Sequence, residues 1–123
     1  MRKTEIRVET AGAFFERGRK TAQLADRGKR IPHSRVVAFE GVQELLKVLS
    51  EKRVLLLTAV KDTPGSITDL ARRLKRDRSA VTRDVQLLER YGVVEVSERP
   101  LPGHGRHKWV GPVAREIRLT AQL

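Results

Sequence analysis

The chain has 123 residues, of which 39% are hydrophobic and 4% aromatic, so it can form one modest core built from Leu, Val, Ile and Ala side chains. It carries 26 Lys and Arg residues against 15 Asp and Glu, which gives a net charge of +11. A small domain this basic repels itself, and nucleic acid is the usual partner that offsets such charge, with an anionic membrane next.

Several classes of protein are disfavoured by what the sequence lacks. There is no cysteine, which excludes disulfides, Cys-based zinc sites and Cys nucleophiles. The longest apolar run, at 54–60, is far shorter than the roughly 20 residues of a membrane span, and the N-terminus lacks the apolar core of a signal peptide. No phosphate-binding glycine loop, paired carboxylates or nucleophile elbow is present. We therefore expect a soluble, cytoplasmic protein that is not an enzyme and needs no cofactor.

Residues 1–40 read as an N-terminal extension that could mediate dimerisation or bind a partner. Alternation of polar and apolar residues predicts a strand over 4–9 and another over 35–41. Between them, 13–28 has a thin apolar stripe and two glycines, which predicts a weak helix. This segment holds 10 Lys and Arg against 5 Asp and Glu, a net charge of +5.

Residues 41–123 are predicted to form the second unit, which begins with clearly helical segments. One long helix or two abutting helices are expected over 42–50 and 51–62. The sequence TPG at 63–65 ends them, and Ser66 then serves as N-cap, with Asp69 three residues later, for a helix over 67–74. The leucines expected in the core of the first segments are Leu45, Leu46, Leu49, Leu56 and Leu57.

A second helix is expected from the N-cap Asp77 to about Tyr91, where Gly92 ends it. A strand over 93–98, a Pro/Gly loop over 99–107, a return strand over 108–111 and a closing strand over 116–123 follow. Helix, turn, helix and β-hairpin in this order predict an α+β winged helix-turn-helix fold with a small strand-helix-strand extension at the N-terminus.

The second helix separates an apolar face from a basic one. With about 100° between successive residues, Val81, Val85 and Leu88 form a buried stripe. The opposite arc carries only positive and neutral polar side chains, since Asp84 lies away from it and Glu89 lies at the far end of the helix. The alternative is a merely basic, solvated helix, but such faces usually mix both signs. The arc contains Arg78, Ser79, Thr82, Arg83, Gln86 and Arg90.

The side chains of this arc match the edges of DNA bases. Arginine pairs with guanine, glutamine with adenine, and small hydroxyl or methyl groups contact thymine or phosphate. A major-groove helix is therefore predicted, with base readout by Arg78, Ser79, Thr82, Arg83 and Gln86. Contacts to the DNA backbone are predicted from the start of the first helix, the turn, the end of the second helix and the basic wing 99–109, through Ser66, Thr68, Lys75, Arg76, Arg90, Arg99, Arg106 and Lys108.

Three other wing residues have two possible interpretations. His104 and His107 could form a metal pair, but without Cys and on a Gly-rich loop they are better read as solvated or phosphate-facing, so no metal is expected. Trp109 is interpreted as a packing residue at the base of the wing, with stacking on a base as the alternative.

The segment 66–96 resembles the MarR-like winged-helix regulators of bacteria and archaea. The first helix has their central alanine at Ala71, and the second follows the pattern V-x-R-D-V-x-x-L-x-x-x-G from Val81 to Gly92. The flanking sequences 39–60 and 116–123 are similar to a compact subfamily that includes antitoxins. Lys75 replaces the small residue often found in the turn, and residues 1–40 do not match the long dimerisation helices of typical members.

The leading hypothesis is a dimeric regulator of transcription that binds double-stranded DNA sequence-specifically. The alternative is an antitoxin that neutralises a protein partner through residues 1–40 and autoregulates through the same DNA-binding domain. A third hypothesis is an RNA-binding or chromatin-like architectural protein. The dimer interface is expected either in 4–9 together with 13–41, or in the closing strand 116–123.

Overall fold

The computed structural model describes residues 3–8, 11–29, 34–39, 41–103, 105–114 and 116–121. Within this part of the chain it has five helices and six strands. Their order is β1 (Lys3–Val8), α1 (Ala11–Asp26), β2 (Ser34–Phe39), α2 (Val42–Val48), α3 (Glu51–Asp62), β3 (Gly65–Ser66), α4 (Ile67–Leu74), α5 (Arg78–Arg90), β4 (Val94–Leu101), β5 (Gly105–Pro112) and β6 (Glu116–Ala121).

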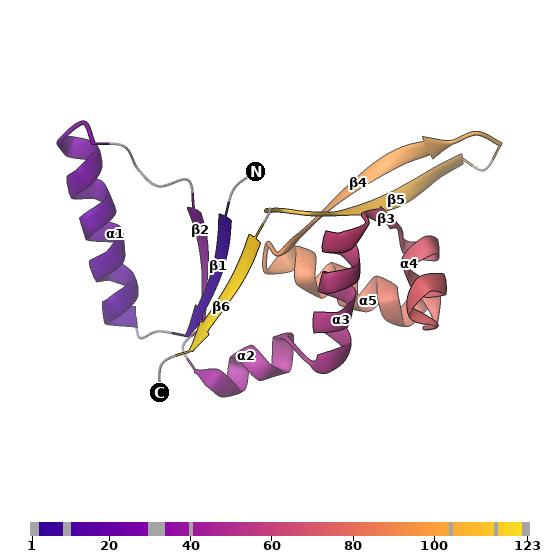
Figure 1. Ribbon diagram of the computed structural model, residues 1–123, viewed down its shortest axis with the longest axis horizontal. Helices are drawn as coiled ribbons and strands as arrows, with labels where there is room; N and C mark the ends of the chain where they lie inside the picture. The colour runs from indigo at the N-terminus through magenta and orange to yellow at the C-terminus, as the bar shows by residue number, and fades with distance from the viewer. Residues whose placement is uncertain are drawn as a thin grey trace.

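The C-terminal two thirds form a winged helix, which confirms the predicted fold class. Helices α3, α4 and α5 pack together, and the antiparallel sheet β3-β5-β4 provides the wing, which projects away from the helices (Figure 1). Apolar side chains from all three helices and from β5 fill the centre. The most completely buried of these are Leu56, Val60, Leu70, Val81, Val85, Leu88 and Val110.

The helix boundaries are set by local hydrogen bonds. The Ser66 hydroxyl accepts a bond of 3.0 Å from the Asp69 amide, as the capping pattern predicted. Helix α5 ends in a Schellman motif, in which Gly92 has φ 75° and the Val93 amide donates to the Leu88 carbonyl at 3.0 Å. The glycine is needed there because a side chain would strain the left-handed conformation.

Helix α4 ends in the same motif, but with a lysine in the left-handed position. Lys75 has φ 53° and ψ 47°, and the Arg76 amide donates to the Ala71 carbonyl at 2.9 Å. A left-handed residue with a Cβ costs roughly 1–2 kcal/mol. The turn is therefore tight despite its lysine, and it carries strain that a glycine would remove.

The predicted helical segments at 42–62 are two separate helices, because Ser50 caps α3 by accepting a hydrogen bond from the Arg53 amide at 3.4 Å. One core prediction was wrong. Leu46 is 62% exposed, because it lies about 100° around the helix from Leu45, and Leu45 and Val48 form the buried face of α2.

The prediction of a loop over 99–107 was also wrong. Strands β4 and β5 continue through most of that segment, because β4 extends to Leu101 and β5 begins at Gly105. Pro100 is tolerated because β4 is an edge strand. It has a neighbouring strand, β5, on one side only, so the missing proline amide breaks no hydrogen bond to a second neighbour. Gly103 and Gly105, with φ of 79° and 73°, make the tight reversal possible.

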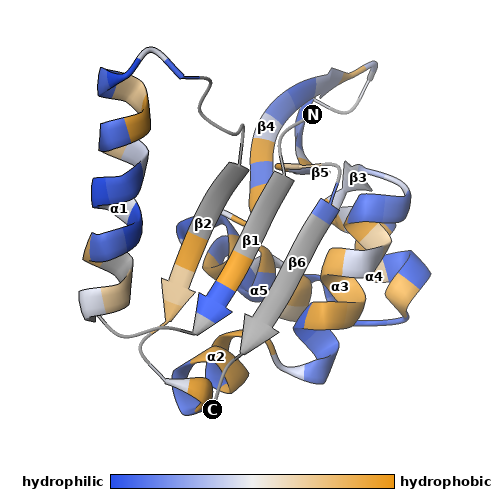
Figure 2. Cartoon of the chain, turned by 60° about the vertical axis from the view of Figure 1, so that its left-hand side comes forward, coloured by the Kyte–Doolittle hydropathy of each residue, from blue (hydrophilic) through white to orange (hydrophobic). Residues whose placement is uncertain are grey.

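The N-terminal segment forms a β-α-β unit whose two strands are parallel, and β6 joins them in a sheet of order β2-β1-β6. The sheet lies between α1 and the winged helix (Figure 1). Figure 2 shows that α1 carries mostly hydrophilic residues. None of its described side chains is buried, and Phe15 is 72% exposed. Parallel strands need such a crossover connection, and here the crossover helix contributes little to the core.

The two predicted units share one core. Ile6 and Phe39 belong to the same buried cluster as the winged-helix residues, and the Phe39 ring stacks on Tyr91 at a centroid distance of 5.4 Å. The closing strand, which the sequence pattern grouped with 41–123, pairs with β1 instead. The boundary at residue 40 therefore marks a change in sequence pattern, while the segments on its two sides pack together in the tertiary structure. No helix in the described ranges is both long and apolar enough to cross a membrane.

Candidate nucleic-acid interface

The N-terminal half of α5 borders an open hollow of about 620 Å³. Four of the five predicted base-reading residues, Arg78, Ser79, Thr82 and Arg83, line it together with Asp77. The fifth, Gln86, is exposed one turn further along the helix, and Arg90 is exposed near its end. We call the set Arg78, Ser79, Thr82, Arg83, Gln86 and Arg90 the basic face of α5.

Two hydroxyl groups of the basic face are already engaged. The Thr82 hydroxyl donates to the Arg78 carbonyl at 2.8 Å, so its methyl group is the part left for a partner. The Ser79 hydroxyl donates to the Asp77 carboxylate. Within the basic face, exposed donor groups are carried by Arg78, Arg83, Gln86 and Arg90.

Asp77 occupies the predicted N-cap position with extended backbone, but its side chain makes no capping hydrogen bond. The bond from the Ser79 hydroxyl is the main cause that lowers the pKa of Asp77 below its ordinary value of 3.8. An ionised carboxylate at this position interacts favourably with the positive end of the helix dipole. It is also the one acid in the hollow.

The predicted backbone-contacting residues around α4 lie in three different environments. Thr68 is exposed in the first turn of the helix, and Ser66 is half-buried with its oxygen accepting the Asp69 amide. Lys75 is exposed in the turn before α5. Lys75 and Thr68 are thus the members of this group with accessible polar ends.

Arg76 is not directed to the surface. Its Nη2 donates to Oδ2 of Asp84 at 2.7 Å, and its side chain is only 17% exposed. A phosphate contact by Arg76 would require breaking this ion pair. The sequence pattern correctly placed Arg76 in the turn between the two helices. It could not predict that the side chain is buried, because the burial depends on the position of Asp84 in the fold.

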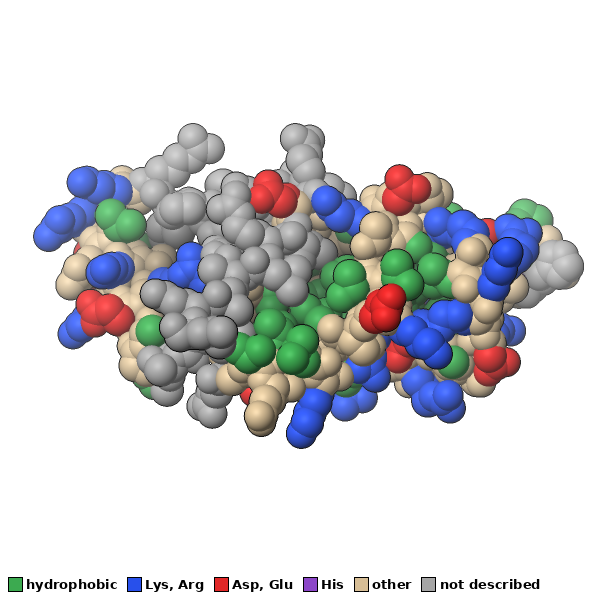
Figure 3. Space-filling model, turned by 60° about the horizontal axis from the view of Figure 1, so that its bottom comes forward, with side chains coloured by type: hydrophobic (Ala, Val, Ile, Leu, Met, Phe, Trp, Pro, Cys, Tyr) green, Lys and Arg blue, Asp and Glu red, His purple; other side chains and the backbone are tan. Residues whose placement is uncertain are grey.

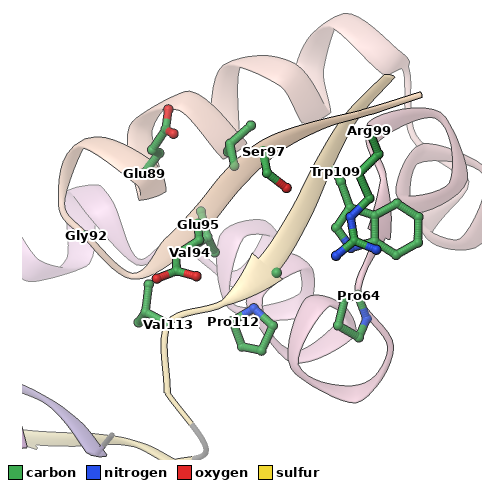
Figure 4. Close-up of a pocket in the computed structure, with 12 residues that line it drawn as sticks. Pro64, Glu89, Gly92, Val94, Glu95, Ser97, Arg99, Trp109, Pro112 and Val113 are labelled. Carbon is green, nitrogen blue, oxygen red and sulfur yellow. The ribbon is translucent and has the colours of Figure 1, made fainter. Parts of the chain in front are cut away.

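The predicted wing cations lie on both faces of the hairpin. Arg99 on β4 lies opposite His107 in the strand register, and its guanidinium stacks over the Trp109 ring, 4.5 Å from the ring centroid (Figure 4). Arg106 and Lys108 alternate onto the other face, where Arg106 pairs with Glu98 at 3.4 Å. Lys108 is exposed.

Trp109 lies at the base of the wing, half-buried, as the packing interpretation predicted. It borders a second hollow of about 750 Å³ between the end of α5 and the outer side of the hairpin. Glu89 and Glu95 also line this hollow, so its charge pattern differs from that of the basic face (Figure 4). Arg99 already covers one face of the indole.

The structure describes one of the two wing histidines. His107 is half-buried on β5, and His104 lies outside the described residues. Among the residues that the structure describes, no group of three or more His, Cys, Asp or Glu side chains is arranged to hold a metal ion.

Sequence reasoning missed the ion-pair network behind α5. Both carboxylate oxygens of Asp84 are held, one by Arg76 and the other by Nε of Arg53 at 3.0 Å. Asp84 is the one buried charged residue in the described part of the chain, with 8% exposure. The available signal was the position of an acid beside the apolar stripe of an otherwise basic helix.

The fold and the basic face define a winged helix-turn-helix protein. Residues 48–112, which are more than half of the chain, match the family model HVO_A0114, and the chain belongs to the HVO_A0114 family. The match covers the winged helix from the end of α2 to the end of β5. No curated protein matches the sequence.

Solved structures resemble this chain at low sequence identity. A possible transcriptional regulator from Methanosarcina mazei Go1 is 20% identical with a TM-score of 0.51, over 63% of this chain and 68% of that one. Reduced HlyU from Vibrio cholerae N16961 is 19% identical with a TM-score of 0.49, over 82% and 81%. A second HlyU structure from that organism is 22% identical with a TM-score of 0.48, over 62% and 83%. The first of these similarities shows a shared fold.

Proposed function

We propose that the protein is a sequence-specific regulator of transcription that binds double-stranded DNA. The observation that carries this proposal is the basic face of α5, which lies on the second helix of a helix-turn-helix and presents Arg78, Arg83 and Gln86 to solvent. In this fold the second helix is the element that enters the major groove. Arginine and glutamine are the side chains best suited to read guanine and adenine there.

The remaining contacts are assigned by their accessibility, except for Ser66, which is kept for its position at the N-terminus of α4. Ser79 and Thr82 complete the base-contacting set on α5. Thr68, Lys75, Arg90 and the wing residues Arg99, Arg106 and Lys108 hold the DNA backbone, with Ser66 at the α4 N-terminus. We leave Arg76 out because its guanidinium is bonded to Asp84. Membership of the MarR-like regulators, inferred from the motif resemblance, stays a prediction.

Selection of bound duplexes from a random-sequence pool tests the proposal. A regulator should enrich a defined sequence, and the logarithm of its binding constant should fall with the logarithm of the salt concentration by about 0.9 per phosphate contact. Competition by random duplex and by double-stranded RNA separates the alternatives. Equal competition by the selected duplex, by random duplex and by double-stranded RNA would support the architectural or RNA-binding hypothesis and contradict sequence-specific regulation.

We also propose that the protein acts as a homodimer through the exposed side of α2 and α3. The exposed ionisable residues there are Glu44, Glu51, Asp62, Lys47, Lys52 and Lys61, three acids and three lysines, so this surface is neutral in a chain of net charge +11. Three large apolar side chains, Leu46, Val54 and Leu55, are exposed among them. We call these nine residues the outer face.

The outer face suits a second copy better than it suits DNA. In a twofold contact the same surface meets itself, so it must carry both charge signs and an apolar centre. Figure 3 shows hydrophobic side chains gathered in the middle of the lower side of the molecule, with Lys and Arg concentrated toward the ends. The strands predicted as the interface are used within the chain, because β1 is paired on both edges. Of the three strands in this sheet, β2 and β6 are the ones with an edge open to pairing with another copy.

A protein-neutralising antitoxin is the second candidate function. The observation in its favour is α1, which lies apart from the winged helix and has no buried side chain among those described (Figure 1). A helix of this kind is suited to fold against a partner. Co-purification of a second protein that is lost in the variant Lys20→Glu/Gln23→Glu, which changes exposed residues of α1 but keeps the crossover between β1 and β2, would support this function. A protein that purifies alone and binds its selected duplex would leave the regulator as the better account.

A further inference from the structure

We propose that Asp84, held by Arg53 and Arg76, is a positioning residue that fixes the rotation of α5 and thereby its base specificity. The inference deepens the proposed function and rests on it. Asp84 lies on the side of α5 away from the basic face, so it does not reach the partner itself. Its two carboxylate oxygens are bonded by guanidinium groups from two different segments of the chain, α3 and the turn before α5.

The two arginines join α5 to separate parts of the structure. Arg53 bonds Asp84 through Nε at 3.0 Å, and its Nη1 donates to the Lys47 carbonyl at 2.6 Å and to the Val48 carbonyl at 3.3 Å. These are carbonyls at the end of α2, which have no partner within the helix. Arg53 thus connects the end of α2 with the middle of α5, and the helix-turn-helix turn is attached to the same carboxylate by Arg76.

The apolar contacts of α5 fix the rotation of the helix about its own axis less strictly than the two guanidinium contacts do. Val81, Val85 and Leu88 are fully buried, but hydrophobic burial is non-directional and tolerates a small turn of the helix about its axis. Hydrogen bonds weaken steeply when donor and acceptor lose alignment. Rotation of α5 would misalign at least one of the two guanidinium contacts, so the network selects one orientation of the basic face.

The energetics also favour positioning over stabilisation. A buried ion pair loses hydration, and apolar residues of similar volume are often equally stable or more stable. This network is moreover incompletely paired, because Nη1 of Arg76 is the one buried side-chain nitrogen or oxygen without a hydrogen-bond partner in the described part of the chain. An unsatisfied donor is costly. Such an arrangement is poorly suited to stabilise the fold but well suited to fix the direction of a helix.

The test compares two variants of the network, one single and one triple, with one matched control. Asp84→Asn removes the charge while keeping the shape, and the triple variant Arg53→Met/Arg76→Met/Asp84→Leu replaces the network by apolar groups. The control is Asp69→Asn, since Asp69 also pairs with two arginines, Arg72 and Arg73, but at a more exposed position on α4. Asp84→Asn and Asp69→Asn each raise the net charge by one, so general electrostatic attraction to DNA changes equally.

Affinity is measured by fluorescence anisotropy for two probes, the duplex recovered by selection and a random-sequence duplex, with folding checked by circular dichroism. We expect both network variants to lose at least about tenfold in the ratio of selected to random affinity, the discrimination carried by one base contact. Binding to the random duplex should persist, because phosphate contacts tolerate a small rotation. The control should keep the wild-type ratio.

The outcomes separate the two proposals. If the wild-type protein binds both duplexes equally, the proposed sequence-specific function fails, and the inference fails with it. If the wild type discriminates and the triple variant keeps the wild-type ratio, the inference alone is wrong. If neither network variant folds, the network stabilises the structure and does not act as a positioning device.

Discussion

The basic face of α5 and the outer face of α2 and α3 are both exposed helical surfaces, but they differ in charge and polarity. The basic face has three arginines and no acid among its six residues. The outer face has equal numbers of acids and lysines around three exposed apolar side chains. The first surface repels a copy of itself and attracts a polyanion, whereas the second can meet a copy of itself. The excess positive charge is therefore distributed unevenly, and its distribution separates two kinds of partner.

The largest effect is expected from the double variant Arg78→Ala/Arg83→Ala. Each arginine that reads a base should contribute about 1–3 kcal/mol, so the affinity for the selected duplex should fall by a factor between about 30 and about 20,000. Gel-shift titration measures this loss.

A matched control removes two cations from the outer face, through Lys52→Ala/Lys61→Ala. The overall charge change is identical, but affinity should fall by much less, because these lysines belong to the neutral surface. Both double variants are compared at protein concentrations at which analytical ultracentrifugation shows them to be dimers, since the two lysines lie on the proposed dimer surface. Equal losses in both double variants would show that net charge alone attracts DNA and would contradict the difference between the two faces.

The next effect concerns the outer face. Leu55→Glu places two like charges at the centre of a twofold contact and should weaken dimerisation by about 2 kcal/mol or more. Leu55 is 55% exposed, so the fold itself should tolerate the change. Analytical ultracentrifugation over a range of concentrations measures the shift toward monomer.

Leu101→Glu is the control for this prediction, because Leu101 is similarly exposed, at 45%, but lies on the wing. It should leave the dimer intact. If Leu101→Glu dissociates the protein while Leu55→Glu does not, the interface lies near the wing and the outer face has been misassigned.

A smaller effect is expected at the turn between α4 and α5. Lys75→Gly relieves the left-handed strain and should raise the stability by up to about 1 kcal/mol, since glycine adopts this conformation freely. The same change should reduce the salt dependence of DNA binding by about 0.9, the contribution of one phosphate contact. Thermal unfolding and a salt titration measure the two effects. An unchanged salt dependence would remove Lys75 from the backbone contacts.

The smallest effect is expected at the edge of the basic face. Ser79→Ala removes the hydrogen bond that lowers the pKa of Asp77, so that pKa should rise toward 3.8. Because the folded-state pKa is depressed, the contribution of Asp77 to stability is present above the unfolded value of about 3.9 and is lost as the pH falls through the folded value. Carboxyl NMR titration measures the shift, and an unchanged pKa would mean that the nearby backbone amides and Arg83 control it.

Most helices of the winged unit could be predicted from local signals. Ser66, Gly92 and the apolar stripe of Val81, Val85 and Leu88 each act within one or two helical turns, so the sequence pattern identified α4 and α5 closely. Strand β3 was not predicted, because two residues carry no periodicity and its pairing partners in β5 are distant in sequence. The length of the wing was underestimated because Pro100 and the glycines resemble a loop.

Residue roles were harder to predict than residue positions. Arg76 and Lys75 are neighbours in the turn with the same charge, yet Arg76 is bonded to Asp84 and Lys75 is exposed. Their difference depends on which groups other helices place nearby. The parallel pairing of β6 with β1 joins the two ends of the chain and has no local signal at either strand.

The sequence by itself determined the helix-turn-helix order, the helix caps and the uneven charge of α5, because each of these depends on residues close together in the chain. The tertiary structure decided which strands pair, that Ile6 and Phe39 belong to the common core, and that Asp84 is held between Arg53 and Arg76. These features depend on contacts between residues far apart in sequence. Such contacts form only when the packing of all the elements brings their groups together.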